Sequence, residues 1–282
     1  MKAMMKWMAV IGLVFVALNS AALDFGQALK DKLNAELPMA PKLVEAVKEA
    51  RGPDESEEIA IGRQISGNLL GAAPLVKDAR LQKYVNQVGT WVASQSERPD
   101  LPWHFGVIQS EDVNAFAAPG GYIFVTLGLY RLLQNEADLA GVLGHEVGHV
   151  IRKHHLKILQ QSKLVDLGSK AFANQVGGND KVQQLIGSGA EIVARGLDKD
   201  AEFEADRIGV VLATRAGYDA FGLPSVLQQI GHFAKDEGSV ALLFKTHPHP
   251  DDRLAKLDGA MEDRFDRIKG ATLEKRLYRV KR

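Results

Sequence analysis

The chain has 282 residues, of which 46% are hydrophobic and 25% are charged, so its composition is that of an ordinary globular protein. The 35 lysines and arginines balance the 35 aspartates and glutamates, which excludes the strongly basic field of many nucleic-acid-binding proteins. There is no cysteine. This excludes disulfides, thiolate metal sites, a cysteine nucleophile and a lipid anchor on an N-terminal cysteine, so any metal ion must be held by histidine and carboxylate side chains.

The N-terminus has the pattern of a secretory signal peptide. Lys2 and Lys6 precede an uncharged apolar run from Trp7 to Leu18, and small residues follow it. We predict that residues 1–22 are a signal peptide, cleaved after Ala22, and that the mature protein is exported without a stable membrane span. The alternative is a retained membrane anchor, which is disfavoured because the run is shorter than the roughly 20 residues that cross a bilayer.

Helical spacing of apolar residues dominates the next stretch. Residues 23–57 are expected to form a helical arm interrupted by prolines. Two amphipathic helices are expected between Glu58 and Gln95, separated by residues 71–74. We expect their apolar faces to pack in the core.

A small sheet is expected in the middle of the chain. Trp103–Val107 alternates as a strand does, and Tyr122–Thr126 is rich in β-branched and aromatic residues. Val113–Ala118 lies between them, followed by a Pro-Gly-Gly turn. These features predict a small antiparallel sheet, followed by a short helix from about Thr126 to Leu133.

Helices are expected to fill most of the second half. Asn135 can cap a helix whose apolar face continues to about Gln160. A long helix from about residue 191 to 216 and another over 221–234 should follow. Residues 246–250 are expected to be rigid and extended, because each proline disfavours the α conformation of the residue before it.

The most specific motif is the HExxH sequence of His145, Glu146 and His149. Histidines four residues apart lie on one face of a helix, so both imidazoles can bind one metal ion. Zn²⁺ held there would lower the pKa of a water molecule toward about 7, and Glu146 is placed to act as general base. The motif also arises by chance, but its position on a capped helix with an apolar face favours a functional site.

A catalytic zinc site needs a third protein ligand. Glu202 and Asp206 are four residues apart, hence on one helical face. Glu202 can then reach the metal, while Asp206 accepts a hydrogen bond from the second nitrogen of a ligand histidine and fixes its orientation. The alternative is that Glu202, Glu204 and Asp206 form a solvated face. The HExxH motif upstream favours the metal site.

The sequences HEVGH, EFEAD and THPHPDDR, in this order, resemble the M48 family of metallopeptidases, the Ste24/HtpX-like group, and within it the soluble periplasmic members without tetratricopeptide repeats. The resemblance implies an α+β fold that is mostly α-helical and zincin-like, with a small antiparallel sheet beside the HExxH helix. It places the peptidase domain at residues 58–257, after the helical arm and before a charged C-terminal tail at 258–282. It also implies a periplasmic location.

The resemblance implies a role for each matching residue. It makes His145, His149 and Glu202 the metal ligands, Glu146 the base and Asp206 the residue behind the ligands. His247 matches a family histidine that approaches the metal and is linked to switching or to transition-state binding. Arg253 matches a family arginine near the oxyanion. The residues that match a strand beside the cleft, where an extended substrate could pair, are Asn114, Ala115, Phe116 and Ala117.

Two further features carry predictions. The tandem His154-His155 is an extra metal site or a solvated helix end, and we expect the solvated end. Residues 162–190 and 246–253 are where we expect a lid over the site, because glycine-rich sequence separates the two ligand helices.

The sequence therefore predicts a zinc-dependent endopeptidase with one Zn²⁺ per chain. The expected substrates are unfolded or misassembled envelope proteins, and envelope assembly machinery is a further possible partner. One alternative is a latent or weakly active quality-control factor that binds clients like a chaperone, with His247 capping the metal site. Another is a structural zinc site in an interaction protein, against which Glu146 argues because a structural site needs no base.

Overall fold

The computed structural model describes residues 53–159, 197–233 and 238–280. By its internal contacts the chain divides into Met1–Pro53 and Asp54–Arg282, and every element described below belongs to the second unit. The predicted signal peptide, residues 23–52 of the predicted arm and the predicted lid over residues 162–190 lie outside the described residues.

Two helices precede the sheet, as the sequence predicted, and each begins at a capping aspartate. Helix α4 spans Glu55–Ala72 and begins with a capping box, in which the Asp54 side chain accepts from the Glu57 backbone and the Glu57 side chain accepts from Asp54. Helix α5 spans Ala79–Ala93 and is capped by Asp78. The predicted apolar face of α5 is buried, at Leu81, Val85, Val88 and Val92.

The sheet has three strands: β1 (His104–Ile108), β2 (Ala115–Ala118) and β3 (Tyr122–Thr126). Strand β3 lies in the middle, antiparallel to β2 and parallel to β1. The sheet is therefore mixed, and the prediction of a purely antiparallel sheet is wrong in this detail. The tight turn at Gly120 and Gly121, both with positive φ, lets β2 pair with β3. Tertiary packing then places β3 beside β1 and leaves β2 at the outer edge.

Helix α6 (Leu127–Leu132) leads into α7 (Glu136–Ile151), whose residues are all buried. The Asn135 side chain caps α7 by accepting from the Asp138 backbone, as predicted. The helix does not continue to Gln160, because Lys153 adopts a left-handed conformation with φ of 57°. A second helical stretch begins directly after this break, at residues 154–159.

Helix α10 (Lys199–Arg215) packs across α7. It begins later than predicted, because residues 197–198 are not helical and Asp198 caps the helix by accepting from the Ala201 backbone. The two helices approach closely at glycines. A Cβ on Gly144 would lie 2.8 Å from the Gly209 carbonyl oxygen, and a Cβ on Gly209 would lie 2.7 Å from the backbone nitrogen of His145. This contact brings the acidic turn of α10 to the histidines of α7.

The chain then forms α11 (Gly222–Gly231), α12 (Ala241–Thr246), α13 (Pro250–Met261) and the short 3-10 helix η1 (Glu274–Arg276). The boundaries of the predicted peptidase domain, 57/58 and 257/258, fall within α4 and α13. That division stays a prediction.

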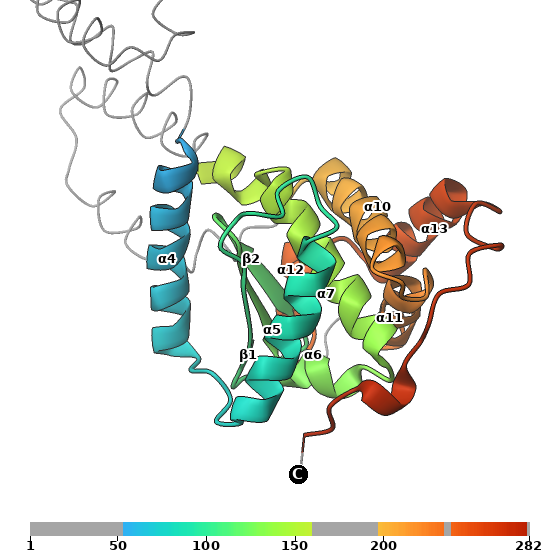
Figure 1. The fold of residues 1–282 in the computed structure, drawn as a ribbon, viewed down its shortest axis with the longest axis horizontal. Coiled ribbons are helices and arrows are strands. Elements are labelled where there is room, and N and C mark those ends of the chain that lie inside the picture. Colours follow the sequence, from blue (N-terminus) through green and yellow to red (C-terminus); the bar gives the residue numbers. More distant parts are fainter. Residues whose placement is uncertain (1–52, 160–196, 234–237, 281–282) are drawn as a thin grey trace, which may run out of the picture. The chain divides into compact units, whose positions relative to one another are not determined.

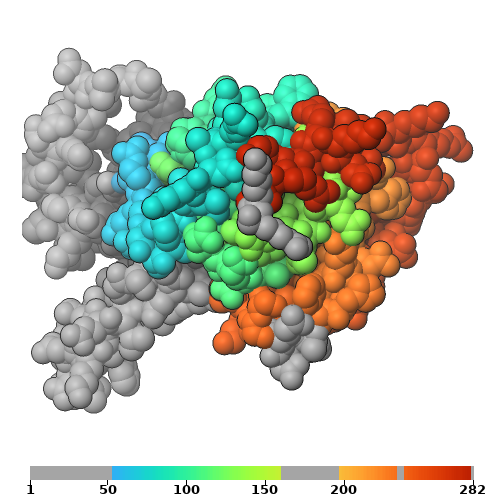
Figure 2. Space-filling view, turned by 90° about the horizontal axis from the view of Figure 1, so that it is seen from below, coloured from blue at the N-terminus to red at the C-terminus, as the bar shows by residue number. Residues whose placement is uncertain are grey.

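The C-terminal segment lies on the surface formed by the α5 and α6 regions, where Figure 2 shows it in red against teal and green. The Tyr278 hydroxyl donates to Asp78 at the start of α5. The Tyr130 hydroxyl of α6 donates to the Tyr278 carbonyl, and Arg279 donates to the Leu133 carbonyl. Leu277 is buried in the main core.

Helix α7 is the centre of the described fold. Figure 1 shows it between the sheet on one side and helices α10 and α11 on the other. The architecture is thus mostly helical with a small sheet beside the HExxH helix, which confirms the predicted fold class. Among the described residues, no helix combines the length and the apolar character that a membrane crossing requires.

Candidate metal centre and active site

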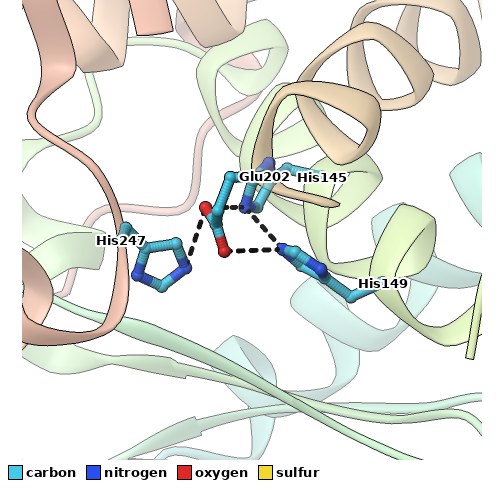
Figure 3. Close-up of side chains that lie close together, drawn as sticks. All are labelled: His145, His149, Glu202 and His247. Atoms are coloured by element: carbon cyan, nitrogen blue, oxygen red, sulfur yellow. Dashed lines mark hydrogen bonds and ion pairs between the residues drawn. The ribbon is translucent and has the colours of Figure 1, made fainter. Parts of the chain in front are cut away.

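Three elements bring four side chains together: His145 and His149 from α7, Glu202 from α10, and His247 from the link between α12 and α13 (Figure 3). One donor atom of each lies within 4.8 Å of the donor atoms of the others. The Glu202 carboxylate lies 3.8 Å from His145 Nε2, 3.5 Å from His149 Nε2 and 3.8 Å from His247 Nε2. Donors bound tetrahedrally to one zinc ion lie about 3.3–3.6 Å apart, close to this spacing.

The surroundings of Glu202 fit a metal ion. Its side chain is fully buried, and neither carboxylate oxygen has a hydrogen-bond partner among the described residues. Burial raises the pKa of Glu202 well above its usual value. A buried carboxylate without partners is costly, and a divalent cation between it and the imidazoles would offset that cost. The nitrogen and oxygen donors are those that zinc accepts.

Burial also sets the charge of the histidines. It lowers the pKa of His145, and it lowers the pKa of His149 and His247 well below the usual value. The three imidazoles are therefore neutral at neutral pH, and a neutral imidazole has one nitrogen lone pair available for a metal ion.

Asp206 and Arg253 lie behind His145. The Asp206 carboxylate is 2.8 Å from His145 Nδ1, so it accepts from this nitrogen and leaves Nε2 as the acceptor. Arg253 donates to Asp206 from Nε at 2.9 Å and from a terminal nitrogen. Burial alone would raise the pKa of Asp206, but Arg253 and His145 lower it below its usual range. The sequence led us to expect a contact between Asp206 and a ligand histidine, and Asp206 contacts His145. The guanidinium of Arg253, for which the resemblance implied a place near the oxyanion, contacts Asp206 and His145.

A small cavity of about 10 Å³ adjoins the cluster. Glu146 lines it together with Glu202 and His247, so the predicted base faces the same space as the predicted ligand Glu202. Burial raises the pKa of Glu146 to about 8. The other residues that line the cavity are Ala115, Phe116, Ala117, His155, Leu197 and Thr246. The volume is about the least that holds one water molecule.

Comparison with known proteins agrees with this geometry. The sequence model of "Peptidase family M48" matches residues 79–261, more than half of the chain. The chain belongs to peptidase family M48. The match begins at the first residue of α5 and ends at the last residue of α13, so it contains both α7 and α10.

Several curated proteins resemble this M48 chain. It is 30% identical over 209 residues to the beta-barrel assembly-enhancing protease of Escherichia coli (strain K12), an alignment that covers 71% of the chain and 42% of that protein. It is 27% identical over 175 residues to the mitochondrial metalloendopeptidase OMA1 of Arabidopsis thaliana, covering 62% of the chain and 35% of the relative. The chain thus spans less than half the length of these relatives.

Three of the four residues predicted to bind substrate line the cavity of the M48 site. Ala115, Phe116 and Ala117 belong to the edge strand β2. Asn114 precedes the strand and is fully buried; its backbone bonds Thr126, and its side-chain oxygen accepts from the Ala115 backbone. Asn114 is not among the residues that line the cavity.

The prediction for the tandem histidines is wrong. His154 and His155 are 5% and 9% exposed, so they are not a solvated helix end. His154 Nδ1 lies 2.9 Å from His149 Nδ1, and His155 lines the cavity. The break at Lys153 is the reason. An unbroken helix would turn His154 about 140° away from His149.

Sequence reasoning also missed Glu204, which was assigned to the solvated alternative. Its carboxylate lies 3.3 Å from His154 Nε2 and 3.0 Å from Arg152 Nε. The only signal in the sequence was the position of His154 and His155 directly after the HExxH helix. Their contacts depend on the positive φ of Lys153, which cannot be predicted from the sequence.

Proposed function

We propose that this M48 protein is a zinc-dependent endopeptidase that hydrolyses peptide bonds of polypeptides. The observation that carries the proposal is Glu202, a fully buried carboxylate without hydrogen-bond partners among the described residues, set against the histidines of an HExxH motif. His145, His149 and Glu202 would hold the ion. When bound there, Zn²⁺ would polarise the scissile carbonyl and acidify a water molecule.

The residues of the chain then have distinct tasks. Glu146 faces the cavity. Its pKa of about 8 would be lowered by a Zn²⁺ ion bound nearby, so that the ionised carboxylate can take the proton of the attacking water as general base. Asp206, held by Arg253, fixes the orientation of His145. Strand β2 lies at the edge of the sheet beside the cavity, so an extended peptide can pair with it and present its carbonyl to the site. Arg253 is the proposed cation on the oxyanion side of the site.

The decisive experiment replaces Glu146 by Gln. We expect cleavage of casein to fall by about 10²–10⁴-fold, because the general base is lost, while the zinc content stays near one ion per chain. Glu202→Ala should lose both cleavage and zinc. Glu111→Gln is a matched control, since Glu111 is an exposed glutamate paired with Arg131. Full casein cleavage by Glu146→Gln would overturn the proposal.

We place the substrates and partners in the cell envelope. Support comes from the predicted signal peptide at residues 1–22 and from the name of the relative, a beta-barrel assembly-enhancing protease. The expected substrates are unfolded or misassembled envelope proteins, and the assembly machinery of such proteins is a proposed partner. N-terminal sequencing of the protein from fractionated cells checks the location, and the expected result is a periplasmic chain that begins at Leu23.

A second candidate function is a latent binding factor, and the place of His247 favours it. His247 Nε2 lies 3.8 Å from Glu202 and within reach of the same ion as the other ligands. A fourth protein ligand would close the site, in keeping with the small cavity. Higher casein cleavage by His247→Ala than by the unmodified protein would support latency. Lower cleavage would assign His247 to catalysis.

A further inference from the structure

We propose that Glu204, acting through His154, fixes the tautomer of His149 and so prepares it to bind the metal ion. The inference rests on the proposed zinc site but concerns two residues outside the ligand set. His154 lies 2.9 Å from His149, Nδ1 to Nδ1. The other nitrogen of His154, Nε2, lies 3.3 Å from the Glu204 carboxylate. Glu204, His154 and His149 thus form a continuous hydrogen-bonded chain.

The direction of each hydrogen bond follows from the carboxylate end. An ionised Glu204 can only accept, so His154 must donate from Nε2. A neutral imidazole has one N–H, so Nδ1 of His154 is left with a lone pair and accepts from Nδ1 of His149. His149 then has its own lone pair on Nε2, the nitrogen that faces Glu202 and His145. The opposite tautomer would direct an N–H toward the metal ion.

The same helix orients both ligand histidines, but by different routes. Asp206 of α10 accepts directly from His145 Nδ1 at 2.8 Å. Glu204, two residues earlier on α10, is farther from the site and reaches His149 only through His154. Both routes leave Nε2 free. Residues of this kind usually change metal affinity by about 10–100-fold when they are removed.

The surroundings hold this chain of contacts in place. Arg152 contacts the Glu204 carboxylate at 3.0 Å and also donates to Glu97. Lys153 makes the left-handed break that turns His154 back toward His149, and its ammonium contacts the buried Glu58 at 3.0 Å. Arg152 and Lys153, which separate α7 from the next helical stretch, therefore each contact an acidic side chain, and these contacts stabilise the bend.

The first experiment compares two glutamates that share Arg152. Zinc affinity is measured by chelator competition on the full chain. We expect Glu204→Ala to weaken zinc binding by about 10-fold, because His149 is no longer held in one tautomer. Glu97→Ala is the matched control: it removes the other carboxylate from Arg152 but does not reach His154, so its zinc affinity should equal that of the unmodified protein. Equal affinities of the two variants would overturn the inference.

The second experiment replaces His154. The Oδ1 atom of an asparagine lies near the position of imidazole Nδ1 and can accept from His149 without help from Glu204. His154→Asn should therefore keep most of the zinc affinity, and adding Glu204→Ala to it should cause no further loss. His154→Leu should lose affinity by about 10–100-fold. If Glu204→Ala weakens zinc binding equally in the His154→Asn background, Glu204 acts by charge alone and the proposed relay is wrong.

A spectroscopic readout separates orientation from packing. The ¹⁵N shifts of His149 should report a protonated Nδ1 in the unmodified protein and mixed tautomers in Glu204→Ala. If His154→Leu does not fold, the Glu204→Ala comparison still decides, because the Glu204 side chain is 40% exposed. Failure of the unmodified protein to bind zinc would reject the zinc site itself. Zinc binding that needs Glu202 but ignores Glu204 would reject only the relay.

Discussion

Glu136 and Glu202 are both fully buried glutamates in the first turn of a helix, but their partners differ. Glu136, at the start of α7, accepts from the Tyr84 hydroxyl at 2.8 Å and the Tyr218 hydroxyl at 2.9 Å, and pairs with Arg276 at 3.0 Å. Neither oxygen of Glu202 has a hydrogen bond from a described residue. Both carboxylates lie at the positive end of a helix, which stabilises a negative charge in both cases. The two glutamates therefore differ in the side chains that compensate their buried charge.

The comparison distinguishes Glu136, a structural carboxylate, from Glu202, a carboxylate that can bind a ligand. Burying a charge costs several kcal/mol unless other groups compensate it. At Glu136 the protein supplies that compensation and so joins α5, α7, Tyr218 and η1. At Glu202 it does not, which leaves the compensation to a metal ion.

The largest expected effect is therefore the response of stability to zinc. Free zinc at about 1,000 times its dissociation constant should raise the free energy of unfolding by about 4 kcal/mol. Chemical denaturation with zinc and with a chelator measures this. Glu202→Ala should lose the response, whereas Glu136→Gln should keep it. A full zinc response in Glu202→Ala would remove the distinction between the two glutamates.

The metal-free protein should show the cost of Glu202 through pH. Burial raises its folded-state pKa above the unfolded value near 4.5, so the folded state keeps a proton that the unfolded state has lost. The free energy of unfolding contributed by Glu202 then falls as pH rises above that value. Glu202→Gln lacks this loss, so without zinc its stability advantage over the unmodified protein should grow from pH 4 to pH 8. The site histidines titrate in both proteins and affect the comparison less. An advantage that is independent of pH would contradict the assignment.

The sequence predicted the elements whose causes are local. Helix α7 has its cap at Asn135 and its apolar residues at helical spacing, and the HExxH spacing fixes which side chains share a face. The four-residue spacing of Glu202 and Asp206 likewise predicted that both face α7, and the structure brings both to the histidines. Resemblance added His247, which no local pattern marked.

The sequence could not predict features that depend on distant parts of the chain. The place of β3 between β1 and β2 follows from tertiary packing, which strand propensity does not contain. The end of α7 depends on Lys153, a residue type that favours a helix but is held with positive φ beside Glu58. For that reason the sequence indicated a solvated helix end at His154 and assigned Glu204 no role in the site.

Glu136 is the structural glutamate of the two, and its contribution to stability can be measured by substitution. Glu136→Gln should lower the free energy of unfolding by about 2 kcal/mol, because a buried hydrogen-bonded charge is replaced by an amide that cannot accept at both ends. Zinc affinity should be unchanged, since Glu136 contacts none of the ligand residues. Glu111→Gln, at an exposed ion pair, should change stability by less than about 0.5 kcal/mol. A parallel loss of zinc affinity in Glu136→Gln would show that the two ends of α7 are coupled.

The smallest expected effects concern the two tyrosines, and their order is informative. Oε1 of Glu136 has both Tyr218 and Arg276, but Oε2 has only Tyr84 among the described residues. Tyr84→Phe should therefore cost about 1–2 kcal/mol and Tyr218→Phe about 1 kcal/mol, measured by denaturant unfolding. The Tyr218 hydrogen bond to Glu136 is buried, whereas the Tyr84 hydrogen bond is only part-buried. The reverse order would mean that burial of the hydrogen bond matters more than the number of donors left to the carboxylate. In that case the lack of hydrogen-bond partners on a buried carboxylate oxygen would be weaker evidence for a metal ligand, and the argument from Glu202 would lose force.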